Sequence, residues 1–296
     1  MTALHETVAA KPQAAPHAHV ARKDPKRWLR FTLALVITVV ALVPVAVVVV
    51  LALRPATGSS SHAFITFANL IDVFRNTDTP IWLANSLAVT LGTVVVSVAV
   101  AAPAGYVLSR GRSKAVSSYS LLLFVIQSLP VITAVIPLFI LFAKLHLVDS
   151  LIGLGIIYVG ISMSVAIWMM AAYMDSIPVS LEQAAWIDGA SLFRGFYSIV
   201  LRNSLPGILS TAIFTYLVSW NDYLVAIVFI RTETKFTLPL GVESFFQQIV
   251  TAWGDVMAVA IVMMAPPILI FAFLMTLTLV VVSVVLYRQI RKAAFH

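Results

Sequence analysis

Residues 181–208 read LEQAAWIDGASLFRGFYSIVLRNSLPGI, and this stretch decides how the rest of the chain is interpreted. It separates two long hydrophobic runs, yet its own residues follow a helical period. Leu181, Ala184, Ala185 and Asp188 fall at i, i+3, i+4 and i+7, which is one face of a short helix. Gly189 follows, where a residue free to adopt φ > 0 can end a helix. The stretch predicts a short helix, a glycine turn and a second amphipathic helix, a projection suited to docking into a groove on a partner.

The composition of the whole chain is that of a polytopic membrane protein. Of its 296 residues, 61% are hydrophobic and only 10% are charged, which excludes an ordinary soluble globule. The chain has no cysteine. Disulfide scaffolds and cysteine-based metal or redox sites are therefore excluded.

Six apolar runs are each longer than the 18 residues or so that mark a membrane-spanning helix. They cover residues 31–53, 81–108, 116–143, 151–174, 208–230 and 256–287. Pro130 and Pro137 in the third run, and Pro266 and Pro267 in the sixth, predict kinks or local breaks. We therefore predict an all-α protein with six transmembrane helices in a domain at 30–287. A disordered basic cytosolic tail at 1–29 precedes this domain, and a short cytosolic tail at 288–296 follows it.

The distribution of basic residues predicts the orientation. If the N-terminus is cytosolic, fourteen of the 19 Lys and Arg residues lie in inner segments and five in outer ones. Cytosolic loops carry the excess of Lys and Arg, so both termini and the 181–208 stretch are expected inside. The net charge of +7 is thus a topology signal. It is not a nucleic-acid signal, because the basic residues flank the spans and do not share one face.

The same stretch resembles the EAA loop of ABC-importer permeases, whose pattern is roughly E-A-A-x-x-D-G-A followed by an aromatic residue, I-x-L-P and a later proline. The matching positions are Gln183, Ala184, Ala185, Asp188, Gly189, Ala190, Phe196, Ile199, Leu201 and Pro206. Gln183 stands where the family usually has Glu, and Arg202 stands where it usually has the first proline. Glu182 is adjacent to Gln183, but it points about 100° away around a helix, so it cannot simply substitute.

Other segments resemble the carbohydrate-uptake branch of these permeases, and the resemblance covers most of residues 30–287. They are Asn85-Ser86, Ala104-Gly105-Tyr106, Ser109-Arg110, Trp220-Asn221-Asp222-Tyr223-Leu224, Thr237-Leu238-Pro239-Leu240-Gly241 and Trp253-Gly254. The family's Gly-rich C-terminal tail is missing here. The resemblance implies the type I importer permease fold in a multi-pass subunit of the cell membrane.

The resemblance also implies partners and a transport activity. The subunit would pair with a second permease, two ATPase subunits and an extracytoplasmic binding protein that delivers a sugar, either a disaccharide or an oligosaccharide. No G-x-x-x-x-G-K-[ST] motif is present, so this chain is not expected to hydrolyse ATP or to bind a cofactor itself. ATP and Mg²⁺ would be used by the separate ATPase.

The resemblance implies a function for each of two loops. The loop at 181–207 would seat in the ATPase and pass on its motion through Glu182, Gln183, Ala184, Ala185, Asp188, Gly189, Ala190 and Phe196. The outer loop at 231–255 would contact the binding protein through Thr237, Leu238, Pro239, Leu240, Gly241 and Ser244.

Polar and aromatic residues within the spans are candidates for a translocation path. They are Asn85, Ser86, Gln127, Trp220, Asn221, Asp222 and Tyr223. Asp222 is the most prominent, because a carboxylate at membrane depth is costly and usually faces a cavity or a partner; it could also lie solvated at the outer interface. The polar side chains could equally hold helices together, and the aromatic ones could belong to an interfacial belt.

Three other functions remain open at this point. The chain could be an ABC permease for another solute, such as a phosphorylated polyol. A secondary transporter would need more buried carboxylates and basic residues than the spans contain. A membrane enzyme would need a nucleophile–base or metal-ligand set, and the sequence has neither an H-E-x-x-H nor a G-x-S-x-G motif.

Overall fold

The computed structural model describes residues 26–55, 65–246 and 252–293, and every regular element in these ranges is helical. The α-helices are α1 (Arg27–Ala52), α2 (Ala68–Asn76), α3 (Thr79–Arg110), α4 (Lys114–Ser128), α5 (Val131–Lys144), α6 (Leu151–Asp175), α7 (Val179–Ile187), α8 (Leu192–Gly195), α9 (Leu205–Trp220), α10 (Leu224–Phe229), α11 (Leu238–Phe246) and α12 (Trp253–Ala293). A π-helix, η1 (Phe196–Leu201), follows α8, and a 3₁₀ turn, η2 (Glu233–Lys235), precedes α11. The predicted all-α class is confirmed. Residues 1–25 of the predicted tail lie outside the described residues, and α1 begins at Arg27, so the last three residues of the predicted tail are helical.

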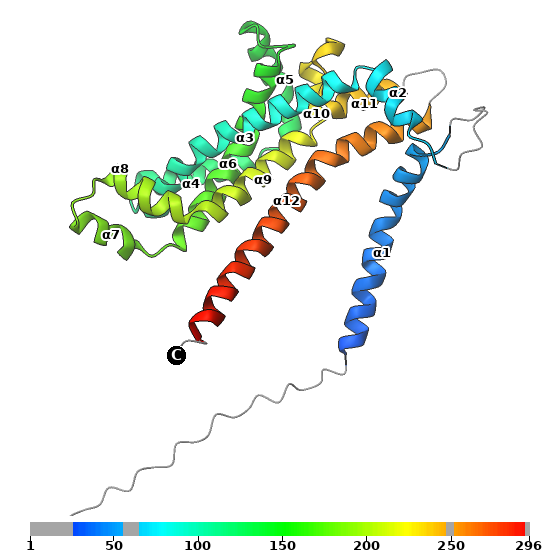
Figure 1. Ribbon diagram of the computed structural model, residues 1–296. Coiled ribbons are helices and arrows are strands. Elements are labelled where there is room, and N and C mark those ends of the chain that lie inside the picture. Colours follow the sequence, from blue (N-terminus) through cyan, green and yellow to red (C-terminus); the bar gives the residue numbers. More distant parts are fainter. Residues whose placement is uncertain (1–25, 56–64, 247–251, 294–296) are drawn as a thin grey trace, which may run out of the picture. The chain divides into compact units, whose positions relative to one another are not determined.

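The chain divides into two units, residues 1–46 and 47–296. Apart from Lys26, the described part of the first unit belongs to a single helix, α1. In the second unit α3, α6 and α9 pack side by side as a bundle (Figure 1). Small residues permit the close approach of helices, as at Gly105, where an added Cβ would lie 2.7 Å from the Cβ of Met170.

Four helices within the described ranges are long and apolar enough to cross a membrane. They contain the segments Trp28–Ala52, Thr79–Arg110, Leu151–Asp175 and Trp253–Thr276. The pair α4 and α5 is a fifth candidate if it is counted as one bent span. The structure thus supports a multi-pass membrane protein, while two of the six predicted spans are not straight helices.

Proline and polar residues explain those two interruptions. The third predicted span breaks at Leu129-Pro130, and α4 and α5 meet there at 96°. This is the local break that Pro130 predicts. The fifth predicted span is divided by residues 221–223 into α9 and the short α10. In contrast, α12 runs unbroken through Pro266 and Pro267 and continues to Ala293, into the predicted tail at 288–296.

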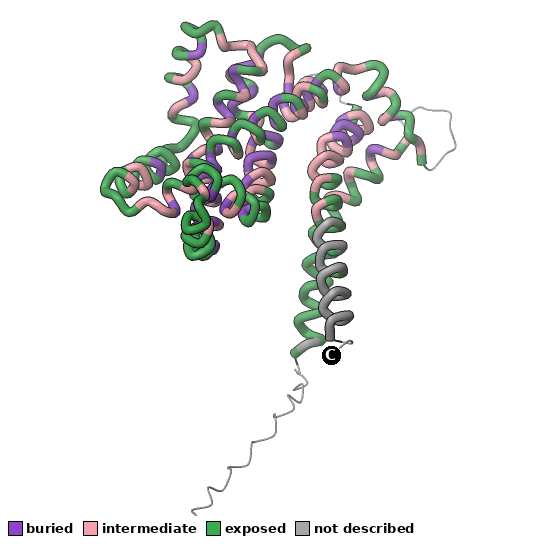
Figure 2. The backbone as a smooth tube through the Cα atoms, turned by 60° about the vertical axis from the view of Figure 1, so that its left-hand side comes forward, coloured by how far each residue is buried: buried purple, intermediate pink, exposed green. Residues whose placement is uncertain are grey.

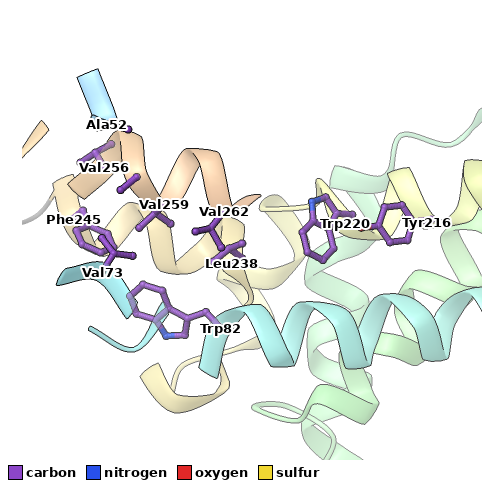
Figure 3. Close-up of a cluster of buried hydrophobic side chains, with 11 residues drawn as sticks. Ala52, Val73, Trp82, Tyr216, Trp220, Leu238, Phe245, Val256, Val259 and Val262 are labelled. Carbon is purple, nitrogen blue, oxygen red and sulfur yellow. The ribbon is translucent and has the colours of Figure 1, made fainter. Parts of the chain in front are cut away.

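Buried side chains form three apolar clusters within the second unit, and the outer surfaces of the helices are mostly exposed (Figure 2). The first cluster joins α2, α3, α11 and α12 around Trp82, Phe245 and Val256 (Figure 3). The second lies among α5, α6 and α10. The third surrounds the junction of α3, α6 and η1. In a membrane, lipid can solvate the apolar sides of helices that do not meet another helix, so such a bundle needs a core only where helices meet.

Candidate functional site

The 179–201 hairpin, formed by α7, α8 and η1, has a turn fixed by hydrogen bonds and backbone geometry. Gly189 has φ +86°, in the left-handed region. Its N–H donates to the carbonyl of Trp186 at 3.0 Å, and the Ala190 N–H donates to the carbonyl of Ala185 at 2.9 Å. These two bonds are those of a Schellman motif, which satisfies the last carbonyls of α7. The predicted glycine turn is confirmed.

The second half of the hairpin begins at a capped helix end. The Ser191 hydroxyl accepts a hydrogen bond from the N–H of Arg194. Gly195 packs against the indole of Trp186, since an added Cβ would lie 3.0 Å from Nε1. The two halves of the hairpin therefore contact each other directly, and Phe196 and Val200 face the third apolar cluster.

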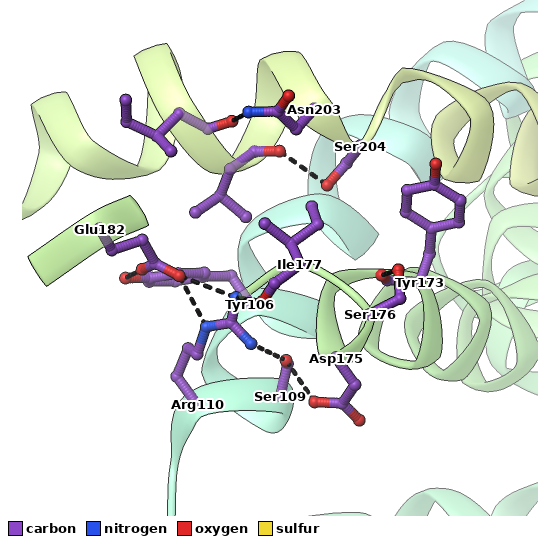
Figure 4. Close-up of polar contacts among 12 residues, drawn as sticks. Tyr106, Ser109, Arg110, Tyr173, Asp175, Ser176, Ile177, Glu182, Asn203 and Ser204 are labelled. Carbon is purple, nitrogen blue, oxygen red and sulfur yellow. Dashed lines mark hydrogen bonds and ion pairs between the residues drawn. The ribbon is translucent and has the colours of Figure 1, made fainter. Parts of the chain in front are cut away.

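Glu182 points into the protein and is almost fully buried. Its carboxylate accepts hydrogen bonds from Arg110 Nε and from the Tyr106 hydroxyl, both at 2.8 Å (Figure 4). Arg110 also donates to the carbonyl of Ile177 at 3.1 Å and to the Ser109 hydroxyl, which donates in turn to Asp175. One guanidinium thus joins the end of α3 to the end of α6 and to α7.

Tyr106 extends this contact to the other half of the hairpin. Its ring centroid lies 4.9 Å from that of Phe196 in η1, while its hydroxyl donates to Glu182 in α7. The last turns of α3 therefore hold both halves of the hairpin. Sequence reasoning missed this role of Tyr106 and Arg110, although a basic residue at the end of a predicted span and the single Glu of the loop were available signals.

The opposite side of the hairpin is a projecting, largely apolar surface. It consists of Trp186, Ile187, Leu192, Phe193 and Tyr197, and Ile187 and Phe193 are 86% and 77% exposed. Gln183, Ala184, Asp188 and Gly189 are exposed beside it, and Ala185 and Ala190 are half-buried.

Two sequence interpretations change here. The face defined by Leu181, Ala184, Ala185 and Asp188 is exposed except at the half-buried Ala185, because Glu182 takes the inward position. Glu182 is therefore not placed to meet a partner directly, as the loop assignment implied. Phe196 is likewise buried.

Asn85 and Ser86 hold the outer segment against α3. The Asn85 amide donates to the carbonyls of Thr234 and Phe236, both at 2.9 Å. The Ser86 hydroxyl accepts from the Leu238 N–H at the start of α11, at 2.6 Å. These residues were candidates either for a translocation path or for contacts that hold the protein together. The observed hydrogen bonds are of the second kind, since they join α3 to the outer segment.

Trp220 and Asp222 also make contacts inside the protein. The Trp220 indole is buried, stacks on Tyr216 at 5.5 Å and donates to the Met263 carbonyl of α12. It therefore does not lie in an interfacial belt. Oδ2 of Asp222 accepts from the Tyr158 hydroxyl at 2.9 Å and from the N–H groups of Val225 and Ala226. Asp222 thus ties α6 to the first turn of α10.

The remaining path candidates lie apart from these contacts. Gln127 and Asn221 are exposed, and the Asn221 amide bonds to its own helix at Leu217. Tyr223 is half-buried beside the second cluster. A recess of about 130 Å³ borders Asp222. This volume is below the roughly 300–1,000 Å³ of typical ligand pockets. The structure does not gather the seven candidates around one cavity within the described residues.

The outer segment at 237–241 is packed into the protein. Thr237, Leu238, Leu240 and Gly241 are buried, and Pro239 and Ser244 are half-buried. An added Cβ on Gly241 would lie 2.1 Å from the Trp82 ring. The four buried residues cannot contact an external partner in this conformation; their role is to seat α11 on α3.

Asp149, which sequence reasoning did not single out, anchors the beginning of the outer segment. Its carboxylate accepts from the N–H groups of Arg231 and Thr232 at 3.0 Å, from the Thr232 hydroxyl at 2.7 Å and from Lys235 Nζ at 2.9 Å. Burial by itself raises the pKa of Asp149. The hydrogen bonds from Lys235, Arg231 and Thr232 together lower the pKa by more than burial raises it, so the pKa of Asp149 lies well below its usual value. Asp149 itself has φ +55°, a turn geometry that Asp tolerates.

Comparison with known proteins identifies relatives over most of this architecture. A family model described as "Binding-protein-dependent transport system inner membrane component" matches residues 97–295. A putative ABC transporter permease protein, ORF1, of Streptomyces antibioticus is 36% identical over 180 residues, which are 61% of this chain and 79% of the relative. The trehalose transport system permease protein SugB of Mycobacterium tuberculosis is 30% identical over 236 residues, which are 76% of this chain and 85% of the relative.

A solved structure has the same fold. It is a chain from the crystal structure of a bacterial ABC transporter involved in the import of the acidic polysaccharide alginate. The TM-score is 0.72 at 18% sequence identity, and the match covers 90% of this chain and 99% of that chain.

Proposed function

This chain belongs to the family of binding-protein-dependent transport system inner membrane components, and on that basis we propose that it is the permease subunit of an ATP-driven importer of a disaccharide or oligosaccharide. It works with a second permease, two ATPase subunits that use ATP and Mg²⁺, and an extracytoplasmic binding protein. It lies in the cell membrane with six crossings and both termini in the cytoplasm.

The projecting surface of the 179–201 hairpin is the observation that carries the proposal. Five large apolar side chains are exposed on a hairpin whose inner side is fixed to α3 by Glu182, Arg110 and Tyr106. Exposed apolar side chains at helical spacing are the usual anchors of a helix that docks in a groove. A rigid attachment behind a docking surface transmits movement of the docked partner, here the ATPase, into α3 and α6.

The substrate class rests on the relatives. SugB is described as a trehalose permease, and it aligns with 76% of this chain. The observed ties of Asn85, Ser86 and Asp222 support assembly of the bundle and do not select a solute. We therefore propose a disaccharide or an oligosaccharide as the substrate.

Cross-linking and transport together test the proposal. Because the chain lacks cysteine, Phe193→Cys provides a single thiol on the docking surface, and Ile152→Cys provides a matched exposed thiol on α6. In the assembled complex the first should cross-link to the ATPase and the second should not. Vesicles with the binding protein should accumulate a labelled disaccharide only with ATP. Accumulation driven by an ion gradient without ATP would instead indicate a secondary transporter.

A reporter pair tests the orientation. A fusion after Arg112 should report from the cytoplasm and one at Thr234 from outside, because three proposed spans separate the two points. Both reporters on one side would contradict the six-span topology.

A further inference from the structure

Helix α2 and the residue before it present an apolar face that the described part of the chain leaves uncovered. Phe67, Ile71 and Phe74 are 62%, 50% and 44% exposed, and Leu70 is half-buried beside them. These positions are three and four residues apart, so they share one side of the helix. Arg75 borders a shallow hollow over this face.

The other sides of α2 are polar or packed. Asp72 and Asn76 lie on the side opposite the apolar face and are joined by a hydrogen bond of 2.5 Å. Val73 is fully buried in the first cluster with Val256 and Val259 of α12 (Figure 3). The helix therefore has an apolar side, a polar side about 180° away, and a flank that fixes it to the bundle.

Two contacts place α2 at the level where two proposed spans end. The Asn69 amide donates to the carbonyl of Ala52, the last residue of α1, at 2.8 Å and to that of Arg54 at 2.9 Å. Gly254, in the first turn of α12, packs on the same amide, since an added Cβ would lie 2.6 Å from Asn69 Nδ2. One side chain thus connects α2 to the end of one membrane-spanning segment and the start of another.

Trp253, which lies next to Gly254, supports a position of α2 at the ends of the spans. Trp253 begins α12 and is 58% exposed. Tryptophan is enriched where a membrane span meets the headgroups. Since Gly254 contacts Asn69, an exposed Trp253 next to it favours a position of α2 at the level of the headgroups.

From this placement we infer that α2 is an interfacial helix. Phe67, Ile71 and Phe74 insert into the outer boundary of the bilayer, Arg75 lies among the phosphate groups, and Asp72 and Asn76 face water. Helices of this kind bury their apolar face about 5–10 Å into the headgroup and acyl boundary. The inference goes beyond the proposed transport function, and it holds whichever solute is carried.

Site-directed spin labelling of the assembled transporter in nanodiscs tests whether α2 lies in the membrane interface. Ile71→Cys and Phe74→Cys provide thiols on the apolar side, Asp72→Cys and Asn76→Cys provide matched thiols on the polar side, and Leu269→Cys is an exposed reference on α12. Oxygen, which concentrates in lipid, and a water-soluble nickel chelate are used as relaxing agents. We expect labels at 71 and 74 to collide several-fold more with oxygen than with the chelate, and labels at 72 and 76 to show the reverse.

Two results would overturn the inference. If labels at 71 and 74 collide mainly with the chelate, the face is exposed to water. If they are immobilised and collide with neither agent, a protein partner covers the face. In both cases the label at 269 should still report lipid, so that failure of the inference is separate from failure of the membrane assignment.

Discussion

The Glu182 carboxylate of α7 and the Arg110 guanidinium of α3 form an ion pair at 2.8 Å, with side chains only 1% and 17% exposed. The pair lies immediately behind the exposed surface of the 179–201 hairpin. A buried carboxylate is retained only with charged and hydrogen-bonding partners, which Arg110 and Tyr106 provide. The hairpin is therefore attached to the bundle by charge as well as by apolar contact.

Glu182→Ala should loosen the hairpin, whereas Gln183→Ala should not. Removing one partner of a buried ion pair leaves the other charge uncompensated, and because Arg110 retains some solvent contact we expect a loss of about 3 kcal/mol, the lower end of the usual range. Hydrogen–deuterium exchange of residues 179–187 in the purified complex measures this loss of stability. Gln183 is exposed, so its alanine variant is the matched control. Equal protection in the two variants would contradict the structural role of the pair.

Gly189→Pro should abolish uptake while the protein remains in the membrane. Proline removes the N–H that bonds to Trp186 and cannot adopt φ +86°. Gly189→Ala should be milder, at about 1–2 kcal/mol, because an added Cβ meets nothing within 4 Å and only the backbone conformation is disfavoured. Uptake and membrane abundance are measured together. Gly160→Ala, at an equally open position in α6, is the control and should behave as the wild type.

Ser86→Ala should free the outer segment from α3. The change leaves the buried N–H of Leu238 without its acceptor, at a cost of about 1–3 kcal/mol. Faster amide exchange across 233–246 is the expected signature. Ser128→Ala is the matched control, because the Ser128 hydroxyl is exposed and bonds only to the Phe124 carbonyl of its own helix. Unchanged exchange in the Ser86 variant would show that α11 is held without the Ser86 hydrogen bond.

Asp222→Asn and Asp222→Ala distinguish a structural tie from a charge in a path. Asn keeps an oxygen that can accept from Tyr158 and from the N–H groups of α10, whereas Ala does not. We expect near-normal uptake with Asn and a loss of stability of about 1–3 kcal/mol with Ala. Thermal unfolding and uptake are measured on both variants. Asn221→Ala, at the exposed neighbouring position, is the control. Loss of uptake in a stable Asn variant would assign a role to the charge.

The Asp149 contact should depend on acid pH in a defined direction. Its pKa in the folded protein is held below the ordinary value of 3.8, so ionised Asp149 stabilises the fold. That contribution is complete above about pH 4 and is lost as the pH falls through the folded pKa. The stability difference between wild type and Asp149→Asn should therefore be constant near neutrality and shrink below pH 4. Asp78→Asn, which removes a carboxylate that makes no cap bond to α3, is the control.

Local sequence determined those features that depend on a few neighbouring residues. The glycine turn at 189 follows from backbone geometry, because Gly alone adopts φ > 0 at little cost. The break at Pro130 follows from the missing N–H and the restricted preceding residue. The apolar runs predicted membrane helices because their length and composition match the bilayer.

Only the tertiary structure decided which side of each helix meets protein. In a lipid environment both the lipid-facing and the protein-facing sides are apolar, so hydrophobic periodicity does not separate them. This is why the sequence did not show that Trp220 lies in the core. Glu182, Leu238 and Gly241 lie in loops outside the predicted spans, where the buried side likewise depends on contacts with distant segments. Each position was set by a partner more than 40 residues away in the chain, namely Arg110 for Glu182, Met263 for Trp220 and Ser86 and Trp82 for the outer segment. Such contacts between distant segments form only when the helices assemble.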